Sequence, residues 1–157
     1  MRILSMRSST LKFSLVLLIS VLAISSLMIF VPASNEELVA TKISYSDINS
    51  SDDMLAFISR FGWKVEQTPV EEVEIVIPNE FDGAFSDYNE IQRAQGLDLE
   101  KYRGEKAVKF TYKVTNYEDF DGTVHINLIV LNNKIIGGDV CSADPNGFIY
   151  GFSGKSA

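Results

Sequence analysis

A long apolar run near the N-terminus limits what this chain can fold into more than any other feature. Residues 13–31 span 19 positions, and serines at four of them are the only interruptions. In a helix, which rises about 1.5 Å per residue, the run covers roughly 28 Å, close to the thickness of the hydrocarbon core of a bilayer. It has no polar face, which argues against a helix on the surface of a globular core. We therefore predict a membrane segment over residues 13–31.

The charges around this segment predict its orientation. Arg2, Arg7 and Lys12 precede the run, whereas Glu36 and Glu37 follow it. The positive-inside rule then places residues 1–12, a basic tail, in the cytoplasm and the remainder of the chain outside. The expected location is the cell membrane, crossed once, with the N-terminus inside and the C-terminal domain outside.

A cleaved secretory signal is the alternative to an anchor. Val31-Pro32-Ala33 fits the small-x-small pattern of a signal-peptidase site, and cleavage there would release a secreted protein. The apolar run is longer than the usual signal core of about 7–15 residues, which favours the anchor. The only cysteine, Cys141, lies far from this run, so a lipoprotein anchor is excluded.

The rest of the chain is acidic. Residues 34–157 hold 11 of the 14 basic residues and all 21 acidic ones, for a net charge of −10. Such a domain repels phosphate backbones, so we do not expect it to bind nucleic acid. We interpret residues 32–49 as a tether and residues 50–157 as one extracytoplasmic domain, long enough to fold without disulfides.

Two helices are predicted at the start of this domain. The first spans Asp52–Phe61, after an N-cap at Ser50 or Ser51, and ends at Gly62. The second spans Glu80–Gln95 and ends at Gly96. Apolar residues at helical spacing mark the buried stripe of each helix. In the first these are Met54, Phe57, Ile58 and Phe61, and in the second Phe81, Phe85, Tyr88 and Ile91, with Gln92 at the margin.

Alternating patterns predict five strands. One covers Val70–Ile77, and the others follow Lys106. The inward rows are Val108, Phe110, Tyr112 and Val114 in one strand, and Val124, Ile126, Leu128 and Val130 in the next. Asn132-Asn133 suits a two-residue hairpin loop, Gly137-Gly138 suggests a bulge within Lys134–Cys141, and Phe148–Phe152 forms a last short strand. The predicted fold is α+β: the membrane helix, then two helices packed on one face of an antiparallel meander.

Few residues suggest chemistry, and each also has a structural interpretation. Cys141 ends an apolar strand and is expected to pack as a small hydrophobe, since a nucleophilic thiol would need a base and His125 is the only histidine. Asp139, after the two glycines, is the best candidate for a carboxylate that acts in hydrolysis. We predict no catalytic, cofactor-binding or metal-binding residues, and no cofactor.

Three further clusters could be sites. Glu71, Glu72 and Glu74 could hold a cation but more simply form a solvated strand face. Glu118–Gly122 is faintly similar to a calcium loop but lacks the later ligands, which favours a hairpin turn. Phe148, Tyr150 and Phe152 share one strand face and could stack against sugar rings, although a core-facing strand has the same pattern.

Several short blocks resemble one known family. They are Gly62-Trp63-Lys64-Val65, Ile77-Pro78, Tyr88-Asn89 with Gln92 and Gln95-Gly96, Asp98-Leu99, Tyr112 to Tyr117, and Ile136-Gly137-Gly138-Asp139-Val140 with Gly147-Phe148. Over about residues 51–152 the chain resembles the Domain of Unknown Function 4830 family of Firmicute proteins. The resemblance implies an N-terminal membrane segment before the domain, and it implies no activity.

Two functions are compatible with these patterns. The first is a membrane-tethered or secreted extracytoplasmic module that binds or regulates a protein partner at the cell surface. The alternative is a cell-surface hydrolase that uses carboxylates. Convergent titratable groups are expected at active sites, and the sequence offers no such set, so we favour the binding module.

Overall fold

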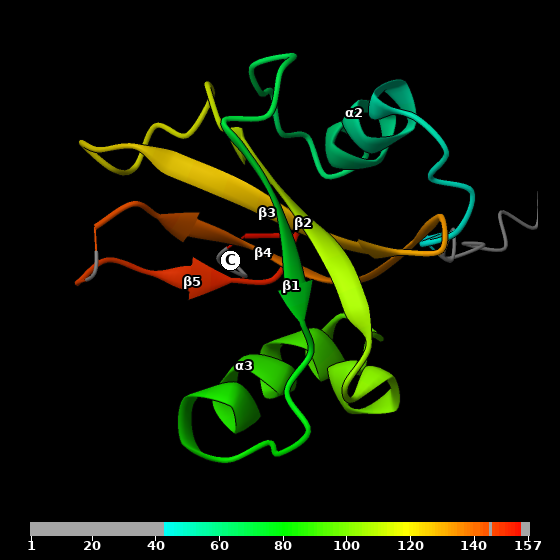
Figure 1. The fold of residues 1–157 in the computed structure, drawn as a ribbon. Coiled ribbons are helices and arrows are strands. Elements are labelled where there is room, and N and C mark those ends of the chain that lie inside the picture. The colour runs from blue at the N-terminus through cyan, green and yellow to red at the C-terminus, as the bar shows by residue number, and fades with distance from the viewer. Residues whose placement is uncertain (1–42, 145, 155–157) are drawn as a thin grey trace, which may run out of the picture. The chain divides into compact units, whose positions relative to one another are not determined.

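A computed structural model describes residues 43–144 and 146–154 (Figure 1). In chain order the elements are α2 (Ser51–Ser59), β1 (Glu71–Val76), α3 (Gly83–Ala94), the 3₁₀ helix η1 (Leu99–Tyr102), β2 (Lys106–Lys113), β3 (Val124–Leu131), β4 (Lys134–Ser142) and β5 (Ile149–Tyr150). The strands form one antiparallel sheet in the order β1-β2-β3-β4-β5. The predicted α+β class, with two α-helices and a five-stranded meander, is confirmed.

The predicted N-terminal segments lie outside this description. The basic tail (1–12), the membrane segment (13–31) and most of the tether (32–49) precede residue 43, where the description begins. None of the helices between residues 43 and 154 is both long and apolar enough to cross a membrane.

The register of the central strands agrees with the sequence prediction. Tyr112 in β2 and Ile126 in β3 are fully buried, whereas Lys113 is exposed. Tyr112 lies directly opposite Ile126, so the two inward rows coincide on one face of the sheet. Because side chains alternate between faces, a shift of one residue would have placed both rows on the opposite face.

Helix α2 covers that face. The Ser50 hydroxyl accepts a hydrogen bond from the backbone N–H of Asp53 at 3.2 Å, which caps the helix as predicted. The helix ends at Ser59, two residues before the predicted end, and Gly62 follows with a φ of +82°. Buried residues from the helix, from β2, β3 and β4, and from the residue that follows β2 form one core with Phe152: Met54, Phe57, Ile58, Tyr112, Val114, Val124, Ile126, Leu128, Ile135 and Val140.

Helix α3 covers the opposite face, which corrects the prediction that both helices share one face. Figure 1 shows α2 and α3 on either side of the sheet. A second, smaller core lies under α3 and η1 and contains Ile77, Leu99, Ala107, Ile129 and Ile136. The reverse face of the sheet also carries polar side chains such as Thr111 and Asn127, which is why the sequence pattern did not indicate that a helix covers it.

The buried stripe of α3 also differs from the prediction. The helix begins at Gly83, three residues later than expected, and its fully buried side chains are Asn89 and Gln92. Phe85, predicted to face the core, is 51% exposed. The hydrophobic pattern predicted that Phe85 would be buried and its polar neighbours exposed. Asn89 and Gln92 are buried because they form hydrogen bonds with Leu99 and Gly138, which a local pattern does not take into account.

The turns at the far edge of the sheet position its last strands. Asn132 and Asn133 both have positive φ angles, 49° and 60°, and form the predicted two-residue hairpin loop. The predicted bulge in β4 falls at Ile136, which has no partner because Ile129 and Val130 pair with the residues on either side of it. Strand β5 is only two residues long, shorter than the predicted Phe148–Phe152.

Candidate functional site

A row of polar side chains crosses four strands on the face that α3 covers. Glu71, Thr111, Asn127 and Asp139 lie directly opposite one another in the pairs β1–β2, β2–β3 and β3–β4. The Thr111 hydroxyl is 2.7 Å from Oδ1 of Asn127, and Nδ2 of Asn127 donates to Oδ2 of Asp139 at 2.8 Å. We call these four residues the polar row. The single hydroxyl hydrogen of Thr111 goes to the nearer acceptor, Asn127, so Thr111, Asn127 and Asp139 form one connected hydrogen-bond network, and Oε2 of Glu71 lies at its end, 3.3 Å from the hydroxyl.

Asp139 is the enclosed end of the polar row. Its side chain is only 4% exposed, and its Oδ1 accepts a hydrogen bond from the Tyr88 hydroxyl of α3 at 2.7 Å. Burial raises the pKa of Asp139, while the hydrogen bonds from Asn127 and Tyr88 oppose that rise. Burial, together with the nearby carboxylate, raises the pKa of Tyr88 well above its ordinary value. The carboxylate therefore holds α3 against β4 and uses both of its oxygens inside the protein.

Cys141 and His125 are cross-strand neighbours, a pairing that the sequence did not reveal. They lie directly opposite each other in β3 and β4, two residues along each strand from the Asn127–Asp139 pair of the polar row. Burial, followed by the effect of Asp139, raises the pKa of the Cys141 thiol to about 12. A thiol of that pKa is almost entirely protonated at neutral pH and is a poor nucleophile. This environment agrees with the packing role predicted for Cys141.

Gln92 of α3 and Gln95, the C-cap of that helix, bind the edge of β4 at Gly138, where β5 does not pair with it. Oε1 of Gln92 accepts from the backbone N–H of Gly138 at 2.9 Å, and Nε2 of Gln95 donates to the Gly138 carbonyl at 2.8 Å. Oε1 of Gln95 also accepts from the N–H of Phe152 at 2.8 Å. Strand β5 pairs with β4 only at Val140 and Cys141. The glutamines thus supply the hydrogen bonds that a longer β5 would have made.

The close contact explains why small residues lie at this point of β4. A Cβ on Gly138 would lie 2.3 Å from the backbone oxygen of Asn127 and 2.5 Å from the Phe152 ring. One on Gly137 would lie 2.9 Å from a methyl group of Leu99. The two glycines therefore serve close packing between β4 and its neighbours.

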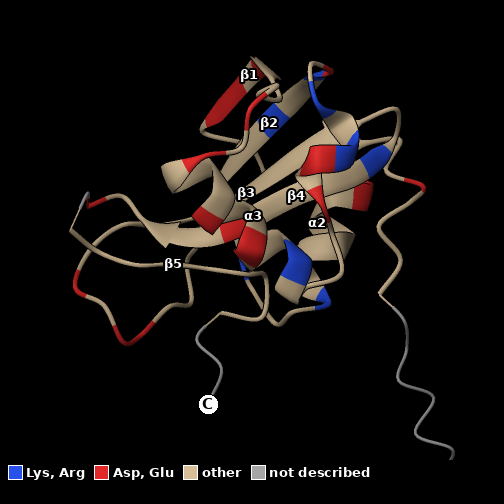
Figure 2. Cartoon of the chain, turned by 90° about the horizontal axis from the view of Figure 1, so that it is seen from below, with Lys and Arg blue, Asp and Glu red and all other residues tan. Residues whose placement is uncertain are grey.

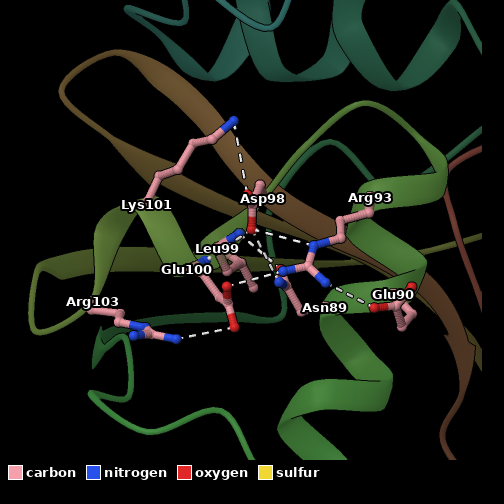
Figure 3. Close-up of polar contacts among 8 residues, drawn as sticks. All are labelled: Asn89, Glu90, Arg93, Asp98, Leu99, Glu100, Lys101 and Arg103. Atoms are coloured by element: carbon pink, nitrogen blue, oxygen red, sulfur yellow. Dashed lines mark hydrogen bonds and ion pairs between the residues drawn. The ribbon is translucent and has the colours of Figure 1, made fainter.

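A polar cluster joins the end of α3 to η1 (Figure 3). Asn89 is 1% exposed; its Oδ1 accepts from the Leu99 N–H at 2.8 Å and its Nδ2 donates to Asp98 at 3.0 Å. Arg93 lies between Glu90 and Glu100, with ion pairs of 2.8 and 3.0 Å. The cluster has both signs of charge and fixes the connection between the two helices. Its exposed ion pairs contribute little, whereas the buried amide of Asn89 fixes the geometry.

The aromatic residues near the C-terminus form a stack. Trp63, Tyr117, Phe148 and Tyr150 lie in series with ring centroids 5.7, 5.1 and 5.0 Å apart and planes within 19° of parallel. Phe152, which the sequence grouped with Phe148 and Tyr150, is instead fully buried in the core. In the stack, ring faces pack against one another, so these aromatic residues chiefly support the fold.

A surface hollow adjoins this stack. It is lined by Trp63, Asn116, Tyr117, Glu118, Asp119 and Ser153 and has a volume of about 290 Å³. Both side-chain ends of Asn116 are already used, because Oδ1 accepts from the Lys64 N–H and Nδ2 donates to the Gly62 carbonyl. Trp63, Asn116 and Tyr117 of the lining thus support the loops, and the carboxylates of Glu118 and Asp119 remain exposed.

The acidic groups noted in the sequence lie on exposed strands and loops. Glu71 forms an ion pair with Lys109 at 2.7 Å, and Glu74 forms one with Lys106 at 2.8 Å. Within the described residues, no three His, Cys, Asp or Glu side chains are grouped closely enough to hold a metal ion. The arrangement therefore favours solvated, ion-paired glutamates on β1 over a cation site.

A family model matches residues 57–140, more than half of the chain, and its description is a domain of unknown function. The chain belongs to the Domain of Unknown Function 4830 family. Searches of curated proteins and of solved structures each returned no match. The family match brings with it no activity, substrate or partner, so any function must be argued from the molecule itself.

The blocks that carried the family resemblance meet in space. Tyr88, Gln92 and Gln95 of α3 all contact the segment around Gly138 and Asp139 of β4. These residues are separated by more than 40 positions in the sequence. In this member of the Domain of Unknown Function 4830 family, the two blocks together build the junction between α3 and the sheet, which is a structural task.

Proposed function

We propose that this protein is an extracytoplasmic binding or regulatory module held at the membrane by residues 13–31. The single observation that supports binding over catalysis is the environment of Asp139, the best candidate for chemistry. Both of its oxygens accept internal hydrogen bonds, and the side chain is 4% exposed. A carboxylate that acts on a substrate must reach it, at least through one water molecule.

The accessible surface offers features for binding instead. The outer edge of β1 is unpaired within the described residues, and hollows of about 290 to 440 Å³ lie on the surface. The net charge of −10 beyond residue 33 favours a basic or neutral partner over an acidic one.

The membrane arrangement is tested by protease added to intact cells that produce the full chain. An anchored domain outside the membrane would be digested while a short N-terminal fragment stayed with the membrane. A secreted form would appear in the medium without residues 1–33, as the cleaved-signal alternative requires. Protection of the whole domain in intact cells, with digestion after lysis, would contradict both arrangements.

The hydrolase alternative is tested with Asp139→Asn and His125→Ala in the full chain. Asparagine can bond to both neighbours at position 139: its oxygen accepts from Asn127 as before, and its amide donates to the Tyr88 oxygen, which reverses the direction of that hydrogen bond. As a binding module, the protein would keep its partner in both variants, and each variant would lose less than about 1 kcal/mol of stability. A hydrolytic activity that either change abolished, with stability unaltered, would replace this proposal with the alternative.

A further inference from the structure

Within the described residues, no strand pairs with the outer edge of β1, which is six residues long. Ile77 donates to the Glu105 carbonyl at 2.9 Å, and this pair continues the register in which odd-numbered residues of β1 lie opposite odd-numbered residues of β2. In an antiparallel ladder, every second residue directs both its N–H and its C=O to the neighbouring strand, and the residues between them direct both groups to the other side. The odd-numbered residues of β1 therefore bond to β2. The N–H and C=O groups of Glu72, Glu74 and Val76 point away from the sheet.

In the part of the chain that the structure describes, neither a proline nor a bulge interrupts this edge. Prolines flank the strand at positions 69 and 78, but residues 71–76 contain none and pair regularly with β2. Val76 is 58% exposed and Val73 is 38% exposed. Edges of this kind accept a strand from another chain unless charges prevent it.

The charges on the edge select what can pair with it. Glu72 and Glu74 project on the α2 side of β1, next to Phe110 and Val108 in β2. Figure 2 shows the acidic colour on β1 and the basic colour on the adjoining β2. In an antiparallel pairing of two copies of β1, these glutamates would meet glutamate or valine of the other copy. Like charges directly opposite each other destabilise a sheet, so self-pairing is disfavoured.

A basic strand would instead gain from the same charges. Glu74 is paired only with the exposed Lys106, and Glu72 has no ion-pair partner among residues 43–154. Glu72 also borders a hollow of about 440 Å³ whose floor includes Val108, Phe110 and Val130. Long basic side chains on an added strand could pack their methylene groups against Val108, Phe110 and Val130 and place their charged ends beside Glu72 and Glu74.

We propose that β1 accepts an extended segment of a partner protein as a sixth strand, with basic residues at alternate positions facing Glu72 and Glu74. The intervening positions would be apolar and would face the exposed side of Val73. Backbone hydrogen bonds to positions 72, 74 and 76 would supply affinity, and the glutamates would supply selectivity. This inference rests on the proposed binding function and names its surface and its partner.

The test uses the full chain in mild detergent and a synthetic probe. The probe is a fluorescent six-residue peptide of alternating lysine and valine with blocked ends, and its anisotropy reports binding. An isomer of the same composition and charge, with lysines at positions 1, 2 and 5 and valines elsewhere, has no two lysines at i and i+2 and so cannot face both glutamates at once. We expect the alternating peptide to bind at least about tenfold more tightly than the isomer, since only it can pair with the glutamates across an added strand.

Variants separate the backbone from the charges. Val76→Pro removes one outward N–H without changing charge, and proline is tolerated on an edge strand at such a position. It should weaken binding of the alternating peptide about fivefold to tenfold. Glu72→Gln should weaken it about threefold, whereas Glu118→Gln, a matched loss of charge in a distant loop, should leave it unchanged.

Three results would overturn the inference: no saturable binding, equal binding of the two peptides, or no effect of Val76→Pro in a folded protein. If Val76→Pro fails to fold, amide shifts of the wild-type protein decide, and the peptide must perturb positions 72, 74 and 76 more than 71, 73 and 75. A partner found at another surface of the domain would end this inference while leaving the proposed binding function intact.

Discussion

Replacing Asp139 should separate a structural carboxylate from a catalytic one. The Asp139→Ala change removes the acceptor for the Tyr88 hydroxyl, 2.7 Å away, and for Nδ2 of Asn127, 2.8 Å away. A buried donor left without a partner costs about 1–3 kcal/mol. Two such donors would cost more, but removal of a desolvated carboxylate opposes the loss. We expect Asp139→Ala to lower the free energy of unfolding by about 2–4 kcal/mol.

The matched variant Asp139→Asn should cost less than about 1 kcal/mol, because it keeps the bond from Asn127, replaces the bond from Tyr88 with one of opposite direction, and removes a buried charge. The assay is urea unfolding of the full chain in mild detergent. Trp63, the only tryptophan, provides the fluorescence signal, and its Nε1 donates to the Phe152 carbonyl at 2.6 Å. Equal losses for the two variants, or a loss below about 0.5 kcal/mol for alanine, would refute the role assigned to the polar row.

Three more outcomes follow from the same region. The pKa of Asp139 is raised in the folded state above the 3.8 of an ordinary aspartate. Wild type should therefore lose stability relative to Asp139→Asn as the pH rises from about 3.8 through the folded pKa. Urea unfolding at a series of pH values measures this loss. The native Cys141 thiol, with its pKa near 12 against an ordinary 9.0, should react with iodoacetamide at pH 8 about a thousandfold more slowly than in the unfolded chain, as mass spectrometry would show. Gly138→Ala should destabilise the protein by about 2 kcal/mol or more, since its Cβ would meet the Asn127 carbonyl, and a thermal midpoint equal to wild type would contradict that contact.

Local patterns predicted the sheet well. Tyr112 and Ile126 alternate with polar neighbours, and alternation alone determines which face each side chain takes. The Asn132-Asn133 loop needed only the tolerance of asparagine for positive φ. These features depend on residues that are adjacent in the sequence, so the sequence was sufficient for them.

The placement of α3 could not be predicted in the same way. Its buried side chains, Asn89 and Gln92, are polar, and the Gln92 side chain gains its partner from Gly138, 46 positions away. A hydrophobic pattern treats such residues as solvent-facing and promotes Phe85 to the core. The cross-strand pair of His125 and Cys141 was missed for a related reason, because its register depends on the hairpin and the bulge together.

The candidate carboxylate was found in the sequence, but its environment was not. Asp139 was selected because two glycines precede it, and the structure shows that those glycines allow close packing instead of presenting the side chain to solvent. Its hydrogen-bond donor Tyr88 lies 51 positions earlier, in a different element. The sequence therefore identified Asp139 as the candidate, but only the fold shows whether its carboxylate is placed for catalysis or for structural support.

Photo-crosslinking in intact cells tests most directly whether the domain binds a partner. A photoreactive amino acid would replace Val76 at the free edge of β1 in the full chain, and in a second protein it would replace the exposed Asp87 on α3. We predict a discrete covalent adduct with one protein from position 76, weak or diffuse labelling from position 87, and the same adduct when Asp139→Asn is added. The absence of a discrete adduct from either position, together with a turnover that Asp139→Asn abolishes, would contradict the account.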